Sequence, residues 1–206
     1  MALTLLQSRI MRLLAKNRSD TSYVAGGLVL NAEWFRQSDD MDIFHDTDEE
    51  IGGTAMKDVE ALRLAGLAVD VDVYAYGVVE VSVSDGHEGT LVQWMSETRR
   101  RFFPLVRDDE WGARLHKADL AVNKVLAASS RTKARDFVDL VSIASFMCSL
   151  GPLLMAAAGK PPHYSPLKMI DQITHRGLSV PDEDYASVKG LPADWTAGFI
   201  RDGLIA

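Results

Sequence analysis

The sequence predicts a mixed α/β fold, in which a small sheet flanked by helices is followed by a helical C-terminal half. Three β-like runs, AVDVDVYAY, VVEVSVS and TLVQWM, follow one another between residues 68 and 95. From about Asp108 onward the β pattern disappears, and apolar residues recur at three- and four-residue steps, as amphipathic helices require. We therefore expect an α/β domain over residues 1–106 and a helical subdomain over residues 107–206.

The first half alternates between helices and strands. Leu5, Ile10 and Leu14 recur at helical spacing, which predicts a leading amphipathic helix. A short apolar stretch, SYVAGG, follows it, then LVLNAEWF and a second strand within QSDDMDIF. Thr47 and Glu50 have the spacing of a capping box, so we expect a helix from there through about residue 67, bent at residues 52–53.

The three β-like runs then complete the sheet. In the first run Val69, Val71 and Val73 alternate strictly with polar residues, which predicts one apolar and one polar face. The segment SDGHEG, residues 84–89, predicts a turn between the second and third runs.

The second half contains an uncharged run of twenty residues, 140–159, which is long enough to span a membrane. Its three serines and the Gly151-Pro152 break favour two buried helical pieces instead, so we expect no membrane span. The proline-rich segment 159–166 predicts a loop, and short helices are expected over 167–175, 182–189 and 193–201.

Charge and cysteine content exclude several classes of protein. Acids outnumber bases 29 to 22, a formal net charge of −7, which argues against a protein that coats nucleic acid through its overall field. Cys148 is the single cysteine, which excludes a disulfide scaffold and a cysteine-based zinc site. A reducing compartment suits this composition, and we expect a cytoplasmic protein.

The most informative segment for function is Ser38 to Phe44, SDDMDIF. On a strand, Asp40 and Asp42 point to the same face about 6.6 Å apart, so they can converge on one cation. Paired carboxylates suit Mg²⁺, which completes its coordination with phosphates and water. The alternative is a solvated acidic face, which is how we interpret the equally spaced Asp70 and Asp72.

A pair of glycines distinguishes the first acidic pair from the second, because it precedes Asp40 and Asp42 and has no counterpart before Asp70 and Asp72. Gly26-Gly27 lies between the short apolar strand and an apolar helix-like stretch. Glycines at such a turn allow backbone N–H groups to approach a phosphate closely. A simple tight turn is the alternative. Arg36, two residues before Ser38, is placed to contact a triphosphate.

Downstream, polar residues interrupt apolar helices between Asp119 and Asp139. Lys124 and Arg131 are seven residues apart and share a face if the helix is continuous through Ser129-Ser130. The structural alternative is that Arg135 and Asp139 form an i,i+4 surface ion pair, which would contribute only a few tenths of a kcal/mol to stability.

Taken in order, these motifs resemble the nucleotidyltransferase-fold proteins of the AbiEii toxin family. The matching segments are Gly26-Gly27, Ser38 to Asp42, Asn123 to Ala127 and Arg135 to Leu140, so the resemblance covers roughly residues 20–145. It implies a nucleotidyltransferase-like mixed sheet flanked by helices. Residues 146–206 are not anchored by it.

The resemblance also implies roles for individual residues. Asp40 and Asp42 would hold Mg²⁺ at the triphosphate of a nucleotide, and Gly26-Gly27 with Ser38 would contact the phosphates. Lys124 would neutralise the phosphates from the helical half, and Asp136 matches a later essential acid. The reaction would transfer a nucleotide to an RNA or protein acceptor, and the protein would be the toxin of a toxin–antitoxin pair with an antitoxin partner.

Two positions depart from the pattern of the family. Leu28 replaces a hydroxyl residue after the glycine pair, and Gln93 occupies the expected position of a third carboxylate. Glu80 on the neighbouring strand is a candidate replacement. These departures leave open a catalytically degenerate nucleotide- or RNA-binding protein on the same fold. Arg99 to Phe103, RRRFF, is a further candidate for RNA contact, with a solvated charge run as the alternative.

Overall fold

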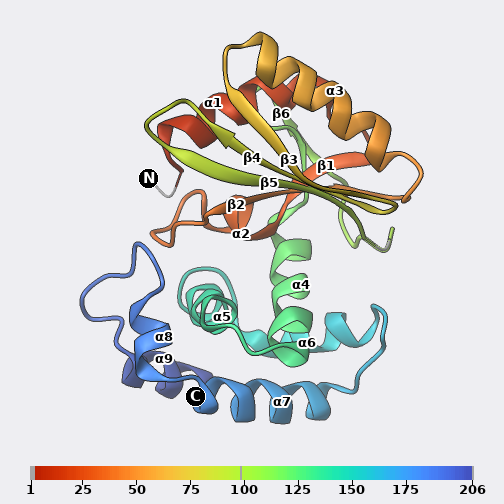
Figure 1. The fold of residues 1–206 in the computed structure, drawn as a ribbon. Helices are drawn as coiled ribbons and strands as arrows, with labels where there is room; N and C mark the ends of the chain where they lie inside the picture. The colour runs from red at the N-terminus through yellow and green to blue at the C-terminus, as the bar shows by residue number, and fades with distance from the viewer. Residues whose placement is uncertain (1–2, 98, 206) are drawn as a thin grey trace. The chain divides into compact units, whose positions relative to one another are not determined.

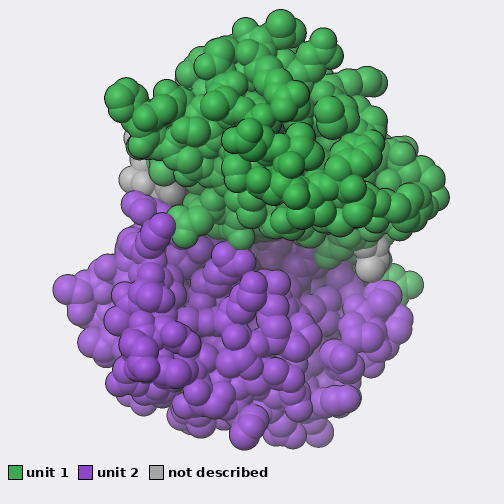
Figure 2. All heavy atoms as spheres, viewed as in Figure 1, with its two compact units in different colours: residues 1–34, 38–116 green, residues 35–37, 117–206 purple. Residues whose placement is uncertain are grey.

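The computed structural model describes residues 3–97 and 99–205, and these form two compact units (Figure 2). The first unit contains residues 1–34 and 38–116, and the second contains residues 35–37 and 117–206. The loss of the β pattern in the sequence predicts a boundary after residue 106. The observed division falls ten residues later because two short strands between residues 106 and 114 pair with the sheet of the first unit.

The first unit is a mixed sheet with helices (Figure 1). Its elements are α1 (Leu5–Leu14), a 3-10 turn (Ala15–Asn17), β1 (Ser22–Ala25), α2 (Gly26–Asn31), β2 (Asp40–His45), α3 (Ile51–Leu64), β3 (Ala68–Ala75), β4 (Val78–Ser84), β5 (Gly89–Ser96), β6 (Val106–Asp108) and β7 (Gly112–Arg114). The strand order is β3-β4-β5-β2-β1-β7-β6. The β2–β5 and β1–β7 pairs are parallel and the other neighbours are antiparallel. The predicted mixed α/β architecture is confirmed.

One face of this sheet forms the core of the unit. Burial alternates along β2, where Met41 and Ile43 are fully buried and Asp40 and Asp42 are half-buried. Helices α1 and α3 cover the apolar face (Figure 1), and Trp94 of β5 is fully buried. The acidic pair therefore lies on the face opposite to this core.

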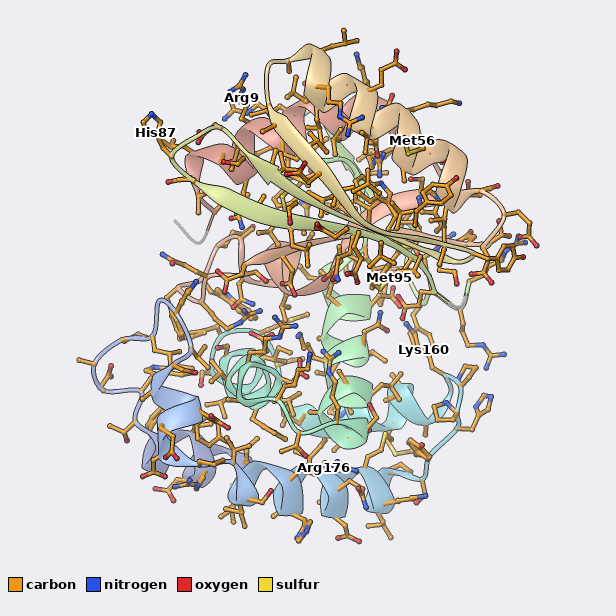
Figure 3. All side chains as sticks on the ribbon, in the orientation of Figure 1. Arg9, Met56, His87, Met95, Lys160 and Arg176 are labelled. Carbon is orange, nitrogen blue, oxygen red and sulfur yellow. The ribbon has the colours of Figure 1, made fainter. Side chains whose placement is uncertain are left out.

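The leading helix and the three β-like runs are confirmed, but two local expectations are wrong. The capping box expected at Thr47 and Glu50 does not form: α3 begins at Ile51, and its N-cap residue, Glu50, makes no side-chain capping hydrogen bond. The helix also continues through residues 52–53 instead of bending there. The predicted turn at 84–89 is present, with His87 at its tip (Figure 3).

The strict alternation expected in the first β run breaks at a bulge. Val71 pairs with Val81, but Val73 pairs with Glu80, so the register shifts at Asp72. Val73 therefore lies on the polar face with Glu80 and not on the apolar face with Val69. A bulge at an edge strand also twists it, which discourages pairing with another chain.

The second unit is helical. Its elements are α4 (Lys117–Ser130), α5 (Ala134–Phe146), α6 (Leu150–Ala158), α7 (Pro166–Ser179), α8 (Asp182–Ala186) and α9 (Ala197–Ile205). The uncharged run 140–159 contains the end of α5 and the whole of α6, separated at residues 147–149. The two pieces are only partly buried, because residues 144–147 and 151–152 are exposed. Pro152 lies in the first turn of α6, where its missing N–H leaves no hydrogen bond unmade. Among the described residues, no helix meets the length and hydropathy needed to cross a bilayer.

A buried ion pair joins α3 to the chain after α1. Asp58 of α3 pairs with Arg18 and accepts hydrogen bonds from Trp94 Nε1 at 2.9 Å and Asn17 Nδ2 at 2.7 Å. Both charged side chains are fully buried; Arg18 pairs with Asp58 through Nη2, and its Nε and Nη1 have no hydrogen-bond partner among the described residues. Asp58 therefore compensates a cation that has no access to water.

Replacing Asp58 by alanine should lower the free energy of unfolding by about 3–5 kcal/mol, because it leaves the Arg18 guanidinium buried and uncompensated. Urea unfolding measures this. Glu60→Ala, at an exposed position of the same helix, is the control and should change stability by less than about 0.5 kcal/mol. Equal stabilities for the two variants would contradict the structural role of the pair.

Candidate functional site

The glycine turn after β1 lies directly against an acidic side chain of β2. Ala25 and Asp42 are partners in the antiparallel β1–β2 pairing. Gly26 follows with a φ of +74°, and a Cβ atom added there would lie 1.8 Å from Asp42 Oδ2. Glycine is required for both reasons, since its backbone is left-handed and any side chain would occupy the position of the carboxylate. The predicted proximity of the glycine turn and the acidic pair is confirmed at Asp42.

Asp40 lies on the same face of β2, two residues before Asp42. Ser38 Oγ donates a hydrogen bond to Asp40 Oδ1 at 2.6 Å, and Gln7 Nε2 donates to the Ser38 carbonyl oxygen at 2.7 Å. Ser38 is buried, whereas Asp40 and Asp42 remain half-buried. The serine hydroxyl therefore orients one carboxylate of a pair that is partly accessible to solvent.

The second acidic pair occupies a different environment. Asp70 and Asp72 are exposed on the edge strand β3, and Asp72 accepts a hydrogen bond from Ser82 Oγ at 2.7 Å. No glycine turn packs against them in the described part of the chain. The interpretation of this pair as solvated is confirmed.

The strand register places three polar side chains in one row across the sheet. Asp42 of β2 pairs with Gln93 of β5, which pairs with Glu80 of β4. Gln93 Nε2 donates a hydrogen bond of 2.6 Å to Glu80 Oε1. Glu80 is two strands away from Asp42, or about 10 Å, which is too far for its carboxylate to join the acidic pair. Its carboxylate is instead hydrogen-bonded to the Gln93 amide.

This donor set decides which metal the site could hold. Among the described residues, no group of three or more histidines, cysteines and acids could hold a metal ion. Two carboxylates on one strand face match Mg²⁺, which takes one or two protein carboxylates and otherwise keeps phosphate and water ligands. Leu28 is buried in the core, so the position after the glycine pair offers no hydroxyl to a phosphate.

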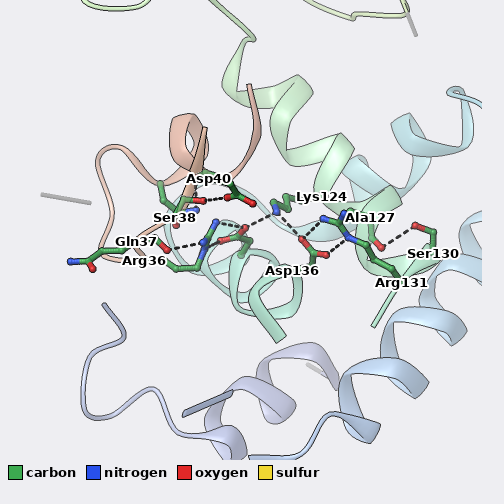
Figure 4. A network of polar contacts seen from close by, with 12 residues as sticks. Arg36, Gln37, Ser38, Asp40, Lys124, Ala127, Ser130, Arg131 and Asp136 are labelled. Carbon is green, nitrogen blue, oxygen red and sulfur yellow. Dashed lines mark hydrogen bonds and ion pairs between the residues drawn. The ribbon is translucent and has the colours of Figure 1, made fainter. Parts of the chain in front are cut away.

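A buried network of charges occupies the second unit, between α4 and α5 (Figure 4). Lys124 of α4 contacts two carboxylates of α5, Asp136 Oδ1 at 2.8 Å and Asp139 Oδ2 at 2.9 Å. Both aspartates are fully buried, and the Lys124 side chain is 11% exposed. The predicted neighbourhood of Lys124 and Asp136 is confirmed.

Two arginines complete this network from outside the helices. Arg131, which follows the last residue of α4, binds Asp136 through Nε at 2.7 Å and Nη2 at 3.1 Å. Arg36 binds Asp139 in the same forked way, at 2.6 Å and 3.1 Å. The helix ends at Ser130, so Lys124 and Arg131 meet on Asp136 and not through a shared helix face.

Ion pairing overrides burial in setting the charge of these groups. Burial alone would raise the pKa of Asp136 and Asp139, but Lys124 and the arginines outweigh it and hold both pKa values below their usual range. Burial would lower the pKa of Lys124, and the two aspartates raise it instead. All three groups are therefore charged at neutral pH.

In the structure Arg36 and Asp139 have ion-pair partners that the sequence did not indicate. Arg36 was expected to face a triphosphate, yet its guanidinium is buried on Asp139, and Nη1 donates to the Gln37 carbonyl oxygen at 2.9 Å. Asp139 is fully buried and not on the surface, and it is the acceptor shared by Arg36 and Lys124. The spacing of Asp136 and Asp139, three residues apart on one helix face, is the signal for this role.

Lys160 is a second buried lysine, which the sequence did not identify as part of a charged cluster. Lys160, labelled in Figure 3, contacts Asn123 Oδ1 at 2.9 Å and Asp119 Oδ1 at 3.2 Å. The polar residues Asp119 and Asn123 on an apolar helix indicate that a cation must reach them. Their partner lies about forty residues away along the chain, so no local pattern identifies it.

The arginine-rich segment RRRFF is largely engaged within the first unit. Arg101 pairs with Asp46 at 2.8 Å, and its guanidinium lies 4.9 Å from the centroid of the Tyr23 ring. Phe102 and Phe103 are about half exposed, and Phe103 stacks on His116. Arg101 thus has a structural partner.

Asp40 and Asp42 belong to the first unit, whereas Lys124 and Asp136 belong to the second. The prediction that these residues serve one nucleotide stays a prediction, as do the phosphate contacts of Gly26-Gly27 and Ser38. In the structure the guanidinium of Arg36 is instead bound to Asp139 and the Gln37 carbonyl oxygen.

Comparisons with known proteins identify the fold. No protein-family model and no curated protein sequence matches the chain. Among solved structures, it is similar to MenT4, a nucleotidyltransferase toxin of Mycobacterium tuberculosis H37Rv, with a TM-score of 0.65 and 15% identity over 97% of this chain and 80% of that one. It is also similar to JHP933 of Helicobacter pylori, with a TM-score of 0.60 and 18% identity over 97% and 88% of the two chains. At these identities the likeness shows the fold alone, and the chain has the nucleotidyltransferase fold.

Gly26→Ala should destabilise the protein more than the same change at another left-handed glycine. Gly66 is the matched control, because its φ is +81° and no atom lies within 4 Å of an added Cβ. Gly66→Ala should cost about 1–2 kcal/mol for the backbone alone. Gly26→Ala must also displace Asp42, so its loss in urea unfolding should exceed that of the control. Equal losses would show that Asp42 moves away without cost.

Proposed function

We propose that this chain is a Mg²⁺-dependent nucleotidyltransferase that moves a nucleotide from a nucleoside triphosphate to an RNA or protein acceptor. One observation carries the proposal: the carboxylate of Asp42 lies against the left-handed Gly26, with Asp40 beside it on the same strand face. This arrangement places a pair of metal-binding oxygens beside a half-buried glycine turn at the start of α2. The nucleotidyltransferase fold and the likeness to MenT4 support it.

In this proposal Asp40 and Asp42 would hold Mg²⁺, which would neutralise and orient the triphosphate. Gly26-Gly27 and Ser38 would contact phosphate oxygens. An acceptor hydroxyl would attack the α-phosphorus and give up its proton to water, a new P–O ester bond would form, and pyrophosphate would leave with the electrons of the broken P–O bond. The contribution of the protein would be positioning and charge stabilisation.

The charged network of the second unit would supply a cation for the phosphates. Lys124 has three N–H donors, and two of them are taken by Asp136 and Asp139 in the structure. We propose that the third donates to a phosphate oxygen. Asp136 would then act by holding Lys124 and Arg131 in place, and Arg36 would act through Asp139.

We further propose that the protein acts in the cytoplasm as the toxin of a toxin–antitoxin pair, with an antitoxin protein as its partner. The likeness to MenT4, described as a nucleotidyltransferase toxin, supports this role. So does the resemblance of the sequence motifs to the AbiEii family.

A non-catalytic nucleotide- or RNA-binding protein on the same fold is the second candidate. The observation that favours it is the neutral Gln93 amide between Asp42 and Glu80. An amide oxygen can coordinate a metal, but it cannot neutralise charge or accept a proton. Nucleotide binding could then persist without rapid transfer.

The double variant Asp40→Asn/Asp42→Asn should lower nucleotide transfer by about 10²-fold or more, because a metal site is worth several kcal/mol in the transition state. Asp70→Asn/Asp72→Asn removes the same charges at the same spacing on β3 and should leave transfer unchanged. The measurement uses each labelled nucleoside triphosphate with Mg²⁺, total RNA and total protein. Mg²⁺-dependent nucleotide binding that is lost in the first variant, with no transfer by the wild type, would establish the second candidate. Absence of both would refute the proposal.

Lys124→Ala should weaken binding of a nucleoside triphosphate on the order of tenfold, or about 1.4 kcal/mol. This is a fraction of the ~4 kcal/mol by which two opposite unit charges attract at close range near a protein surface. Lys160→Ala is the matched control, because it also removes a buried lysine from a buried aspartate. Both variants should lose stability, as urea unfolding reports, but isothermal titration should show weaker nucleotide binding for Lys124→Ala alone. Equal nucleotide affinities for the two variants would make Lys124 a structural residue.

A further inference from the structure

A polar pocket of about 240 Å³ lies within the second unit, between the end of α4 and one face of α7. We call it the α4–α7 pocket. Six of its lining residues are Ser129, Ser130, Tyr164, Lys168, Gln172 and Arg176. None of its lining residues is acidic, although the chain as a whole carries a net charge of −7. The pocket therefore differs in charge from the protein that contains it.

The two cations of the α4–α7 pocket are not neutralised by ion pairs in the described part of the chain. Arg176, labelled in Figure 3, donates to Gln172 Oε1 at 3.0 Å and to Thr132 Oγ1 at 3.2 Å, and neither acceptor is charged. Lys168 is exposed, and its ammonium lies 4.7 Å from the centroid of the Tyr164 ring. Arg131, by contrast, is paired with the buried Asp136.

The helix geometry arranges these groups in a line. Lys168, Gln172 and Arg176 follow one another at four-residue steps on α7, so they share one side of the helix, and the two cations are about 12 Å apart. Asp171 lies about 100° around the helix from Gln172 and does not line the pocket. Lys168 also belongs to the first turn of α7, where the helix dipole favours an anion.

The other wall of the pocket presents little negative charge. Helix α4 ends there, and its last carbonyl oxygens would repel an anion. Ser129 Oγ donates to the Leu126 carbonyl oxygen at 2.8 Å, and Ser130 Oγ donates to that of Ala127 at 3.1 Å. These hydroxyls satisfy carbonyl groups of the final turn, so the wall is compatible with a bound phosphate.

We infer that the α4–α7 pocket binds the phosphate backbone of single-stranded RNA, with Lys168 and Arg176 on different phosphates of one strand. Two unpaired cations in a line, next to an aromatic ring, match the requirements of a single-stranded nucleic acid better than those of one small anion. This inference rests on the proposed function, because it selects RNA from the two acceptor classes named there.

The test measures binding of a short labelled single-stranded RNA by fluorescence anisotropy, without nucleotide or Mg²⁺, over a salt series from about 50 to 200 mM. Each phosphate contact on a single strand contributes about 0.7 to the slope of log K against log salt concentration. Lys168→Ala/Arg176→Ala should therefore reduce the slope by about 1.4 and weaken binding about 25-fold near 0.1 M salt. Lys168→Ala alone removes an exposed side chain, which preserves the fold, and should reduce the slope by about 0.7.

Lys16→Ala/Lys57→Ala removes two exposed cations of the first unit and serves as the control for net charge. Equal RNA affinity and slope in the two double variants would overturn the inference, as would a wild type that binds no RNA. Loss of nucleoside triphosphate binding, with RNA binding retained, would also overturn it. A wild type that binds RNA through this pocket but transfers no nucleotide would refute the proposed catalysis and leave the RNA site standing.

Discussion

The second unit is organised around the buried carboxylate of Asp139. A charge without access to water must be paired, and Asp139 is paired twice, with Arg36 through a forked contact and with Lys124. The first of these pairs ties residues 35–37 to a unit that otherwise begins at residue 117. The second places the Lys124 ammonium between two helices and fixes its charge. Removal of Asp139 would leave the buried Arg36 guanidinium without its carboxylate partner, whereas removal of either cation would leave Asp139 with one partner of its two.

The first unit depends on a different constraint, which is the close contact between a backbone turn and a carboxylate. The register of β1 and β2 sets Ala25 opposite Asp42, and the left-handed Gly26 then turns the chain around that carboxylate. Only glycine satisfies both the backbone conformation and the available space. The same register continues to Gln93 and Glu80, so the chemistry of this face is decided by strand pairing.

Different regions of this protein differ in charge, and the net charge of the whole chain does not describe any of them. The acids of β2 face away from the core, the charges of α4 and α5 cancel within a buried network, and the cations of the α4–α7 pocket remain unpaired within the described residues. A net charge of −7 excludes a general nucleic-acid coat, but it does not constrain a pocket of a few residues. The proposed transferase requires both kinds of surface, one for a metal and one for an anionic strand.

The sequence by itself determined the class of fold, the leading helix, the three central strands and the common face of Asp40 and Asp42. These features follow from periodicities of two and 3.6 residues, which act over a few neighbouring positions. Gly26-Gly27 was also recognisable from the sequence, because glycine is the residue that most readily adopts the left-handed backbone of such a turn.

Only the tertiary structure decided the partners of these residues. Strands β6 and β7 have three residues each, too few for a periodic pattern, and β7 exists because β1 offers it a parallel edge. The bulge that moves Val73 to the polar face, the pairing of Asp139 with Arg36, and the contact of Lys160 with Asp119 join residues that are distant in sequence. Burial makes such pairs obligatory, but which side chains meet is set by how the helices and strands pack, and no local pattern encodes that choice.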